Sequence, residues 1–317
     1  MDQAVHPVPT AMRVPLAVLA AFAGIYVIWG TTYLAIAVAI RSLPPFISGT
    51  LRFAIAGGLM YAWLRARNPR PFAGLNVPLM ALAGILLSGV GNGFVVFAQQ
   101  GIPSGITALI VASMPVLVLI LDWAFFSKRP PTRQALLGIA IAVAGVATIV
   151  MHTHSISGNA RPLYLLAMFV ATAGWSFGTL LQKRAAPPGT VLSFTAGQML
   201  FGAAFQAFMS LVTGEWSTFD PAQISLESAL AVLYLVVFGS IIALTAYVWL
   251  LTRVPAPKVA TYALVNPVVA LFLGAVVLGE RVTPSAMIAA VLVLLGVALI
   301  LFQNLPALRL LSARRGR

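Results

Sequence analysis

The sequence predicts an all-α integral membrane protein with ten transmembrane helices, arranged as two inverted five-helix repeats around a central cavity. The first observation is composition: 61% of the 317 residues are hydrophobic and only 8% are charged, whereas a soluble domain carries about a quarter of its residues as charges. The second is that the apolar residues gather in runs long enough to cross a bilayer. The third is that the two halves of the chain carry corresponding motifs.

The apolar runs give the expected spans. A helix needs about 20 apolar residues to cross the hydrocarbon core of a bilayer, and ten runs of about that length are separated by short charged or Pro/Gly-rich joints. They are Leu16–Ala39, Pro45–Leu64, Val77–Ala98, Ser104–Phe126, Ala135–Met151, Leu163–Leu181, Val191–Val212, Ser228–Leu250, Ala256–Leu278 and Pro284–Phe302. Glycine and proline inside these runs are compatible with helices, since membrane helices tolerate both.

The basic residues predict the orientation. With the N-terminus in the cytoplasm, fifteen of the 19 Lys and Arg residues fall in inner segments and three in outer segments, while Arg52 lies inside a run. The inner ones are Arg13, Arg65, Arg67, Arg70, Lys128, Arg129, Arg133, Lys183, Arg184, Arg253, Lys258, Arg309, Arg314, Arg315 and Arg317; the outer ones are Arg41, Arg161 and Arg281. This is the positive-inside pattern, so we expect both termini in the cytoplasm.

Charge also bears on partners. The net charge of +13 is accounted for by cytoplasmic loops facing the bilayer surface, and we expect no nucleic-acid partner. The longest outer segment, between Glu215 and Glu227, holds acids and no base. We expect it to be a solvated membrane face.

Corresponding motifs predict an internal repeat. The matched pairs are Ile28-Trp29-Gly30-Thr31 with Gly174-Trp175-Ser176-Phe177, Pro44-Pro45 with Pro187-Pro188, Ser88 with Ser240, Pro103 with Pro255, and Pro115 with Pro267. Because each copy holds five spans, the second copy inserts with the opposite orientation, a design that recurs in transporters with the substrate site near the midplane between the halves. We expect a first repeat at residues 14–152, a second at 162–303 and a basic cytoplasmic tail at 304–317.

Two prolines lie in the middle of predicted spans. Pro115 and Pro267 lack an N–H and displace the carbonyl four residues back, which frees backbone acceptors near the membrane centre that a neighbour, water or substrate must satisfy. Asn266 sits beside the second proline, with Tyr262 four residues earlier on the same helical face. Either these residues bind substrate or they form a packing kink with Asn266 bonded internally, and the sequence supports both interpretations about equally.

Helical spacing gathers further aromatic and polar side chains on single faces, which suits a cavity for organic solutes because such cavities are mostly apolar with a few placed polar groups. The predicted substrate-binding residues are Trp29, Tyr33, Arg52, Asn92, Pro115, Trp175, Ser240, Tyr247, Tyr262, Asn266 and Pro267. Packing against lipid is the alternative for each aromatic ring. It suits the asparagines less, since an amide facing lipid is costly.

Three charged residues could act within the bundle. Arg52 lies about 12 Å into the second span at the helical rise, where a charge is costly and by default functional. It could bind a substrate carboxylate or pair with an acid, or else bond helix-end carbonyls or snorkel outward. Asp122 could exchange protons, but we favour an ion pair with Lys128 or an arginine at the inner rim. Glu280, at the outer end of the ninth span, fits a gate or helix-end anchor.

Several function classes lack their residues. There is no cysteine, and the histidines are only His6, His152 and His154, near termini or loops. No G-x-S-x-G, H-E-x-x-H or Walker phosphate loop occurs, and the H-x-H of His152 and His154 has no further ligands nearby for a metal. We therefore expect no enzyme activity, no cofactor and no metal.

Motifs along nearly the whole chain resemble one family. They are Ile28-Trp29-Gly30-Thr31-Thr32-Tyr33, Arg52-Phe53, Val90-Gly91-Asn92-Gly93, Ile102-Pro103-Ser104-Gly105, Phe238-Gly239-Ser240-Ile241-Ile242, Tyr262-Ala263-Leu264-Val265-Asn266-Pro267-Val268-Val269 and Gly279-Glu280-Arg281. They are similar to the EamA branch of the drug/metabolite transporter superfamily. The resemblance implies a secondary transporter of the bacterial inner membrane that exports small organic metabolites, such as amino acids or drug-like compounds, with proton coupling left open. A facilitative channel and a ligand-binding membrane sensor are the alternatives.

Overall fold

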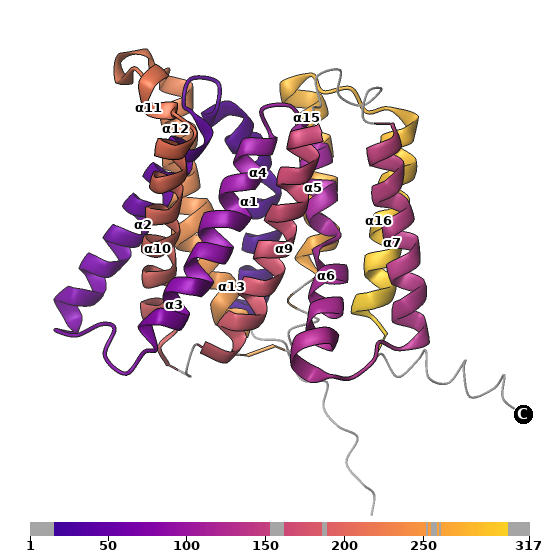
Figure 1. Ribbon diagram of the computed structural model, residues 1–317, viewed down its shortest axis with the longest axis horizontal. Helices are drawn as coiled ribbons and strands as arrows, with labels where there is room; N and C mark the ends of the chain where they lie inside the picture. Colours follow the sequence, from indigo (N-terminus) through magenta and orange to yellow (C-terminus); the bar gives the residue numbers. More distant parts are fainter. Residues whose placement is uncertain are drawn as a thin grey trace, which may run out of the picture.

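The structure is a computed structural model that describes residues 16–152, 162–185, 189–251, 253–254, 259 and 261–303. Its main elements are α1 (Leu16–Ala39), α2 (Pro45–Arg67), α3 (Val77–Gly84), η1 (Ile85–Gly91), α4 (Asn92–Ala98), α5 (Ser104–Ala112), α6 (Met114–Leu121), η2 (Asp122–Ser127), α7 (Arg133–Met151), α9 (Pro162–Ala185), α10 (Val191–Val212), α11 (Glu215–Thr218), η3 (Pro221–Gln223), α12 (Leu226–Tyr234), η4 (Leu235–Ile242), α13 (Ala243–Leu251), α15 (Tyr262–Leu278) and α16 (Pro284–Leu301). Within these residues all regular structure is helical, and the helices run side by side as one bundle (Figure 1).

Parts of the predictions fall on residues outside the described ranges. They include Pro187-Pro188, Pro255, His154, the start of the ninth span at Ala256, the loop residues Arg13, Arg161 and Lys258, and the basic tail at 304–317.

The bundle has the dimensions of a membrane protein. Eight helical stretches among the described residues are long and apolar enough to cross a bilayer, and α15 is a shorter apolar helix of 17 residues. The 23-residue α2 is less apolar because it carries Arg52, Arg65 and Arg67, and it packs against α10. Large apolar side chains cover the outside, for example Phe169, Phe272 and Leu230. The coarse prediction of an α-helical membrane protein is therefore confirmed.

Two helices start earlier than predicted because of their N-terminal caps. The Thr132 hydroxyl accepts a hydrogen bond from the Ala135 nitrogen at 3.2 Å, so α7 begins at Arg133. The Ser225 hydroxyl accepts one from the Ser228 nitrogen at 3.2 Å, so α12 begins at Leu226. These side chains satisfy backbone N–H groups that the first helical turn leaves without partners.

Three predicted spans are not uniform α-helices. The third and eighth contain the π-helical segments η1 and η4, and the fourth divides at Ser113 into α5 and α6 and ends in the π-helical η2. The division follows from Pro115, which has no N–H to continue the helix, and the Ser113 hydroxyl donates to the Ile110 carbonyl at 2.7 Å. Pro267, in contrast, lies inside a continuous α15. The two prolines predicted to act alike thus have different local effects.

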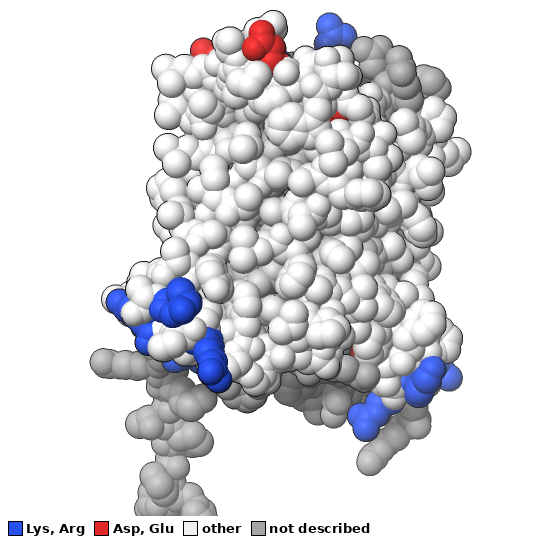
Figure 2. Space-filling model, turned by 60° about the vertical axis from the view of Figure 1, so that its left-hand side comes forward, with Lys and Arg blue, Asp and Glu red and all other residues white. Residues whose placement is uncertain are grey.

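Charge divides the two ends of the bundle. Most of the Lys and Arg visible in Figure 2 gather at one end, and acidic side chains are visible near the other. We call the end that carries Arg65, Arg67, Lys128 and Arg129 the basic end, and the end that carries Glu215 the opposite end. At the basic end the Arg67 guanidinium lies 4.0 Å from the Trp63 ring centroid, a cation–π contact.

Candidate functional site

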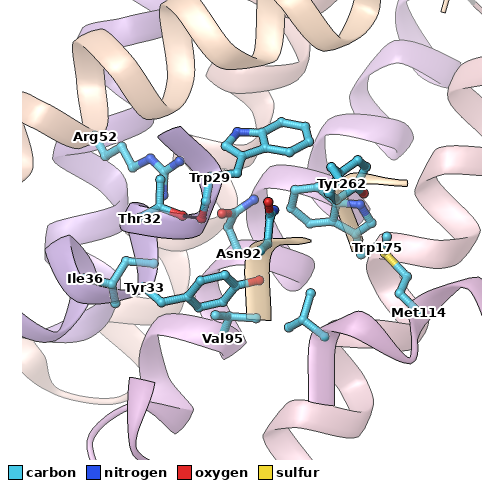
Figure 3. Close-up of a pocket in the computed structure, with 12 residues that line it drawn as sticks. Trp29, Thr32, Tyr33, Ile36, Arg52, Asn92, Val95, Met114, Trp175 and Tyr262 are labelled. Carbon is cyan, nitrogen blue, oxygen red and sulfur yellow. Dashed lines mark hydrogen bonds between the residues drawn. The ribbon is translucent and has the colours of Figure 1, made fainter. Parts of the chain in front are cut away.

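A cavity lies at the centre of the bundle (Figure 3). Both halves of the chain line it: α1, α2, α4, α5 and α6 contribute from the first half, and α9 and α15 from the second. The lining residues are Trp29, Thr32, Tyr33, Ile36, Arg52, Asn92, Val95, Val111, Met114, Trp175, Tyr262 and Asn266. A mostly apolar cavity with a few polar groups is typical of sites for small organic molecules.

Three packed rings stand at one side of this cavity, with Trp29 and Tyr262 lining it and Tyr247 behind them. The Trp29 ring centroid lies 4.8 Å from that of Tyr262 and 5.1 Å from that of Tyr247, and the two tyrosine rings are 5.8 Å apart. The Trp29 indole nitrogen donates to the Gly239 carbonyl at 3.2 Å. Because its one donor is occupied, the indole is held in position and offers its apolar surface to an occupant.

Arg52 enters the cavity from α2. Its Nε donates to the Ser240 hydroxyl at 2.9 Å, and its guanidinium lies 4.7 Å from the Phe53 ring centroid. The side chain is only 6% exposed, so it does not snorkel to the surface. Among the described residues its hydrogen bond goes to Ser240 and not to a helix-end carbonyl. No described Asp or Glu pairs with it either, which removes the predicted internal acid partner from this part of the chain. Figure 3 shows it beside Thr32 and Trp29.

Two asparagine amides are fixed by helix carbonyls. The Asn92 Nδ2 donates to the Leu87 carbonyl at 3.3 Å, across the junction of η1 and α4. The Asn266 amide is satisfied when its nitrogen donates to the carbonyls of Tyr26 at 3.2 Å and Tyr262 at 3.1 Å, an orientation assigned from its neighbours. Both amide nitrogens therefore donate hydrogen bonds to backbone carbonyls, and both side chains line the cavity. Asn266 is therefore bonded internally, as one of its two interpretations expects, and it also lines the cavity, while substrate binding by Asn266 stays a prediction.

Seven of the eleven predicted substrate-binding residues line the cavity, and four lie just behind it: Pro115, Ser240, Tyr247 and Pro267. Each of the four is in contact with or adjacent to a lining residue. Ser240 holds Arg52 and Tyr247 packs on Trp29, while the two prolines follow Met114 and Asn266 in sequence.

Five lining residues were not predicted: Thr32, Ile36, Val95, Val111 and Met114. Helical spacing could have found several of them, because Thr32, Ile36 and Val95 follow Trp29, Tyr33 and Asn92 by three residues. Their small or apolar side chains carry no chemical signature of their own.

At the opposite end, two glutamates cap helix N-termini. The Glu280 carboxylate accepts from the nitrogens of Ser104 at 2.6 Å and Gly105 at 3.1 Å, at the start of α5. This contact is that of a helix-end anchor rather than a cavity residue.

Glu215 makes the same contact with the start of α2, accepting from the nitrogens of Phe46 at 3.1 Å and Ile47 at 2.9 Å. Burial raises the pKa of its carboxyl group, and the two backbone hydrogen bonds oppose that rise. The sequence had assigned Glu215 to a solvated face, which is wrong for this residue because it is half-buried against α2.

Asp122 does not form the predicted pair with Lys128. Lys128 adopts a left-handed backbone conformation with φ 56°, and its ammonium donates to the Ala124 carbonyl instead. Asp122 begins η2 and is half-buried. Among the described residues no ion pair forms with it.

Comparisons with known proteins agree with this architecture. The sequence model of the EamA-like transporter family matches residues 15–151 and 162–302. Over 292 residues the chain is 36% identical to a protein of Escherichia coli (strain K12) named uncharacterized inner membrane transporter YedA, covering 90% of each. It is 26% identical over 295 residues to the probable amino-acid metabolite efflux pump of Salmonella typhimurium (strain LT2), covering 88% of this chain and 92% of that protein.

A solved crystal structure of a protein with 22% sequence identity matches with a TM-score of 0.63, over 93% of this chain and 98% of the other, and so has the same fold. The bundle and its central cavity define an α-helical membrane protein whose cavity is lined by both halves of the chain. Within that class, the chain belongs to the EamA-like transporter family. The resemblance found in the sequence motifs is thereby confirmed.

Proposed function

We propose that this protein is a secondary transporter that moves small organic metabolites across the bacterial cytoplasmic membrane by alternating access. The observation that carries the proposal is the mid-bundle cavity, to which both halves of the chain contribute. A site shared by two halves can be exposed to either side when one half rocks against the other. Export is the favoured direction, by analogy with the relative named as an amino-acid metabolite efflux pump.

The proposed architecture is ten transmembrane helices in two inverted five-helix repeats, residues 14–152 and 162–303, followed by a basic tail at 304–317, with both termini cytoplasmic. Crossed contacts between the halves support it. In the first half α2 contacts η4 of the second, and in the second half α10 contacts η1 of the first. Ser240 in η4 and Ser88 in η1 both take part in these contacts. The gathering of basic side chains at one end supports the orientation (Figure 2).

An aromatic cluster of Phe46, Phe94, Phe97 and Tyr164 supports gating at the opposite end. Phe46 lies 5.7 Å from Phe94 and 5.8 Å from Phe97 between ring centroids, and Phe97 lies 5.5 Å from Tyr164. The cluster joins the first turn of α2 to the end of α4 and the start of α9. In the proposed mechanism it closes the cavity on that side and separates when the halves rock.

The test is counterflow in proteoliposomes that hold the purified protein and a labelled pool of amino acids, with and without a pH gradient. We expect saturable exchange that unlabelled substrate competes away and that protein-free liposomes lack. Dependence on the pH gradient would assign proton coupling, with Asp122 as the residue to substitute first. Conductive, non-saturable flux would favour a channel instead, and ligand binding without exchange by folded protein would favour a sensor.

A further inference from the structure

The cavity carries a single formal charge. Of the twelve described residues that line it, Arg52 is the only basic one and none is acidic. A buried charge without a counter-ion is costly. The charge must therefore be matched, either by the protein or by what enters the cavity.

The protein matches only part of the guanidinium. Among the described residues, Arg52 has one hydrogen bond, from Nε to the Ser240 hydroxyl at 2.9 Å, and one ring contact with Phe53. An arginine has five N–H donors in a fork that suits a carboxylate or a similar planar anion. The two terminal nitrogens, which carry four of those donors, have no described protein acceptor. Ser240 thus fixes the side chain by one edge and leaves the other edge for a ligand.

The backbone leaves room for this arrangement at Gly239. A Cβ atom at that position would lie 3.3 Å from an Arg52 terminal nitrogen and 3.2 Å from the Thr32 methyl carbon. The Gly239 carbonyl also accepts the Trp29 indole hydrogen bond. One turn of η4 therefore positions both the cationic and the aromatic part of the cavity.

The rest of the lining suits an apolar body. Trp29 and Tyr262 pack edge to face, and Val95, Val111 and Met114 add aliphatic surface. In Figure 3, Arg52 lies on one side of the cavity, and Trp175 and Tyr262 lie on the other. A ligand that uses both sides has an anionic head and an apolar tail.

We propose that the cavity selects small organic anions, with a carboxylate or equivalent head bound in the fork of Arg52 and an apolar body against the aromatic wall. This inference rests on the proposed transport function for its physiological meaning. It concerns binding, however, and is tested by binding alone.

The probes are 3-phenylpropionate, 3-phenylpropionamide and 3-phenylpropylamine, which share a ring and differ in the charge of the head group. Affinities are measured by calorimetry on purified wild-type protein in lipid nanodiscs at pH 7. Charge-assisted hydrogen bonds are about twice as strong as neutral ones, so we expect the anion to bind at least about tenfold more tightly than the amide or the amine. Equal affinities, tighter binding of the amine, or no binding of the anion would overturn the proposal.

Substitutions of Arg52 test whether this residue causes the preference for anions. Arg52→Gln should reduce anion affinity about tenfold or more and leave the amide within about threefold, while Arg52→Lys should keep part of the preference as a point charge without the fork. Arg41→Gln, which removes an exposed arginine outside the cavity, should change nothing. A full anion preference in folded Arg52→Gln would overturn the proposal. If that variant does not fold, the wild-type comparison and Arg52→Lys decide.

The proposed function can fail separately. If the wild-type protein exchanges neutral solutes in counterflow and shows no preference for anions, the proposed transport function is supported and the proposed anion selectivity is wrong. If anion binding depends on Arg52 but no solute is exchanged, the proposed anion selectivity is supported and the proposed transport function is wrong.

Discussion

Two crossings between helices of the first and second halves differ in their chemistry. Where α2 crosses η4, Arg52 bonds the Ser240 hydroxyl and faces the cavity. Where α10 crosses η1, the Gln206 amide nitrogen donates to the Ser88 carbonyl at 2.6 Å and is fully buried away from the cavity. The first crossing is open and charged, and the second is closed and neutral. The first crossing therefore leaves a charged side chain at the cavity, and the second forms a packed contact.

The closed crossing depends on small residues. An added Cβ at Gly49 would lie 1.7 Å from the Gln206 side-chain oxygen, and one at Gly202 would lie 2.3 Å from the Ser88 Cβ. These glycines let α2, α10 and η1 approach closely, as small residues do between membrane helices. The two crossings should therefore respond to substitution in opposite ways, one in transport and the other in stability.

The largest expected effect is on transport at the open crossing. Arg52→Gln should lower the initial rate of counterflow by a factor of about ten to one hundred, the equivalent of ~1.4 to 3 kcal/mol for a lost charged interaction. Thermal unfolding in detergent should show an unchanged or higher Tm, because the desolvation cost of the buried charge disappears. A normal transport rate together with a lowered Tm would mean that Arg52 is structural.

The closed crossing should show the reverse. Gly49→Ala should lower the free energy of unfolding by about 1–3 kcal/mol through overpacking against Gln206, measured by thermal unfolding of the purified protein. Gly58→Ala on the same helix is the matched control, since nothing lies within 4 Å of its added Cβ, and it should be neutral or slightly stabilising. Equal effects of the two substitutions would contradict the close packing at this crossing.

The aromatic wall and the amides should give smaller losses of transport. Trp29→Ala and Asn266→Ala should each lower the counterflow rate about three- to tenfold, as expected for ~1 kcal/mol of lost contact, with expression unchanged. Wild-type rates in both variants would exclude the cavity as the site of transport.

The sequence predicted residues that share a helix face but not the contacts between distant helices. Spacing within one helix predicted Trp29, Tyr33, Asn92 and Asn266, because residues three or four apart share a face. The partners of Arg52 and Glu215 lie 188 and 168 or more residues away, and no local pattern encodes such contacts.

The π-helical segments within the predicted spans could not be predicted from the sequence either. The π-helical segment η1 packs closely against α10, and the sequence of η1 alone does not reveal this contact. The general architecture was predictable because hydrophobic length and charge asymmetry are properties of each segment by itself.

The smallest expected effect concerns the cap at the start of α2. Burial raises the pKa of the Glu215 carboxyl in the folded state, so the folded protein binds more protons than the unfolded chain as pH rises above the ordinary glutamate value. Stability from this group is then present at low pH and decreases as pH rises through the folded pKa. The Tm of wild-type protein should fall slightly more between pH 4.5 and pH 7 than that of Glu215→Gln.

Glu227→Gln is the control for that comparison, since Glu227 is exposed in the same outer region. It should retain the wild-type dependence of Tm on pH. A steeper fall in Glu215→Gln than in wild type would contradict the assigned direction.

Alternating access requires that the cavity can be reached from both sides of the membrane, and thiol labelling measures this directly. The chain has no cysteine, so Val95→Cys introduces a single thiol at the cavity, and Val143→Cys introduces one at an exposed apolar position on α7 as the control. A membrane-impermeant thiol reagent is applied to right-side-out and to inside-out vesicles. We expect Val95→Cys to react from both sides, transported solute to protect it, and Val143→Cys to react from neither. Reaction of Val95→Cys from one side only, or from neither, would contradict alternating access.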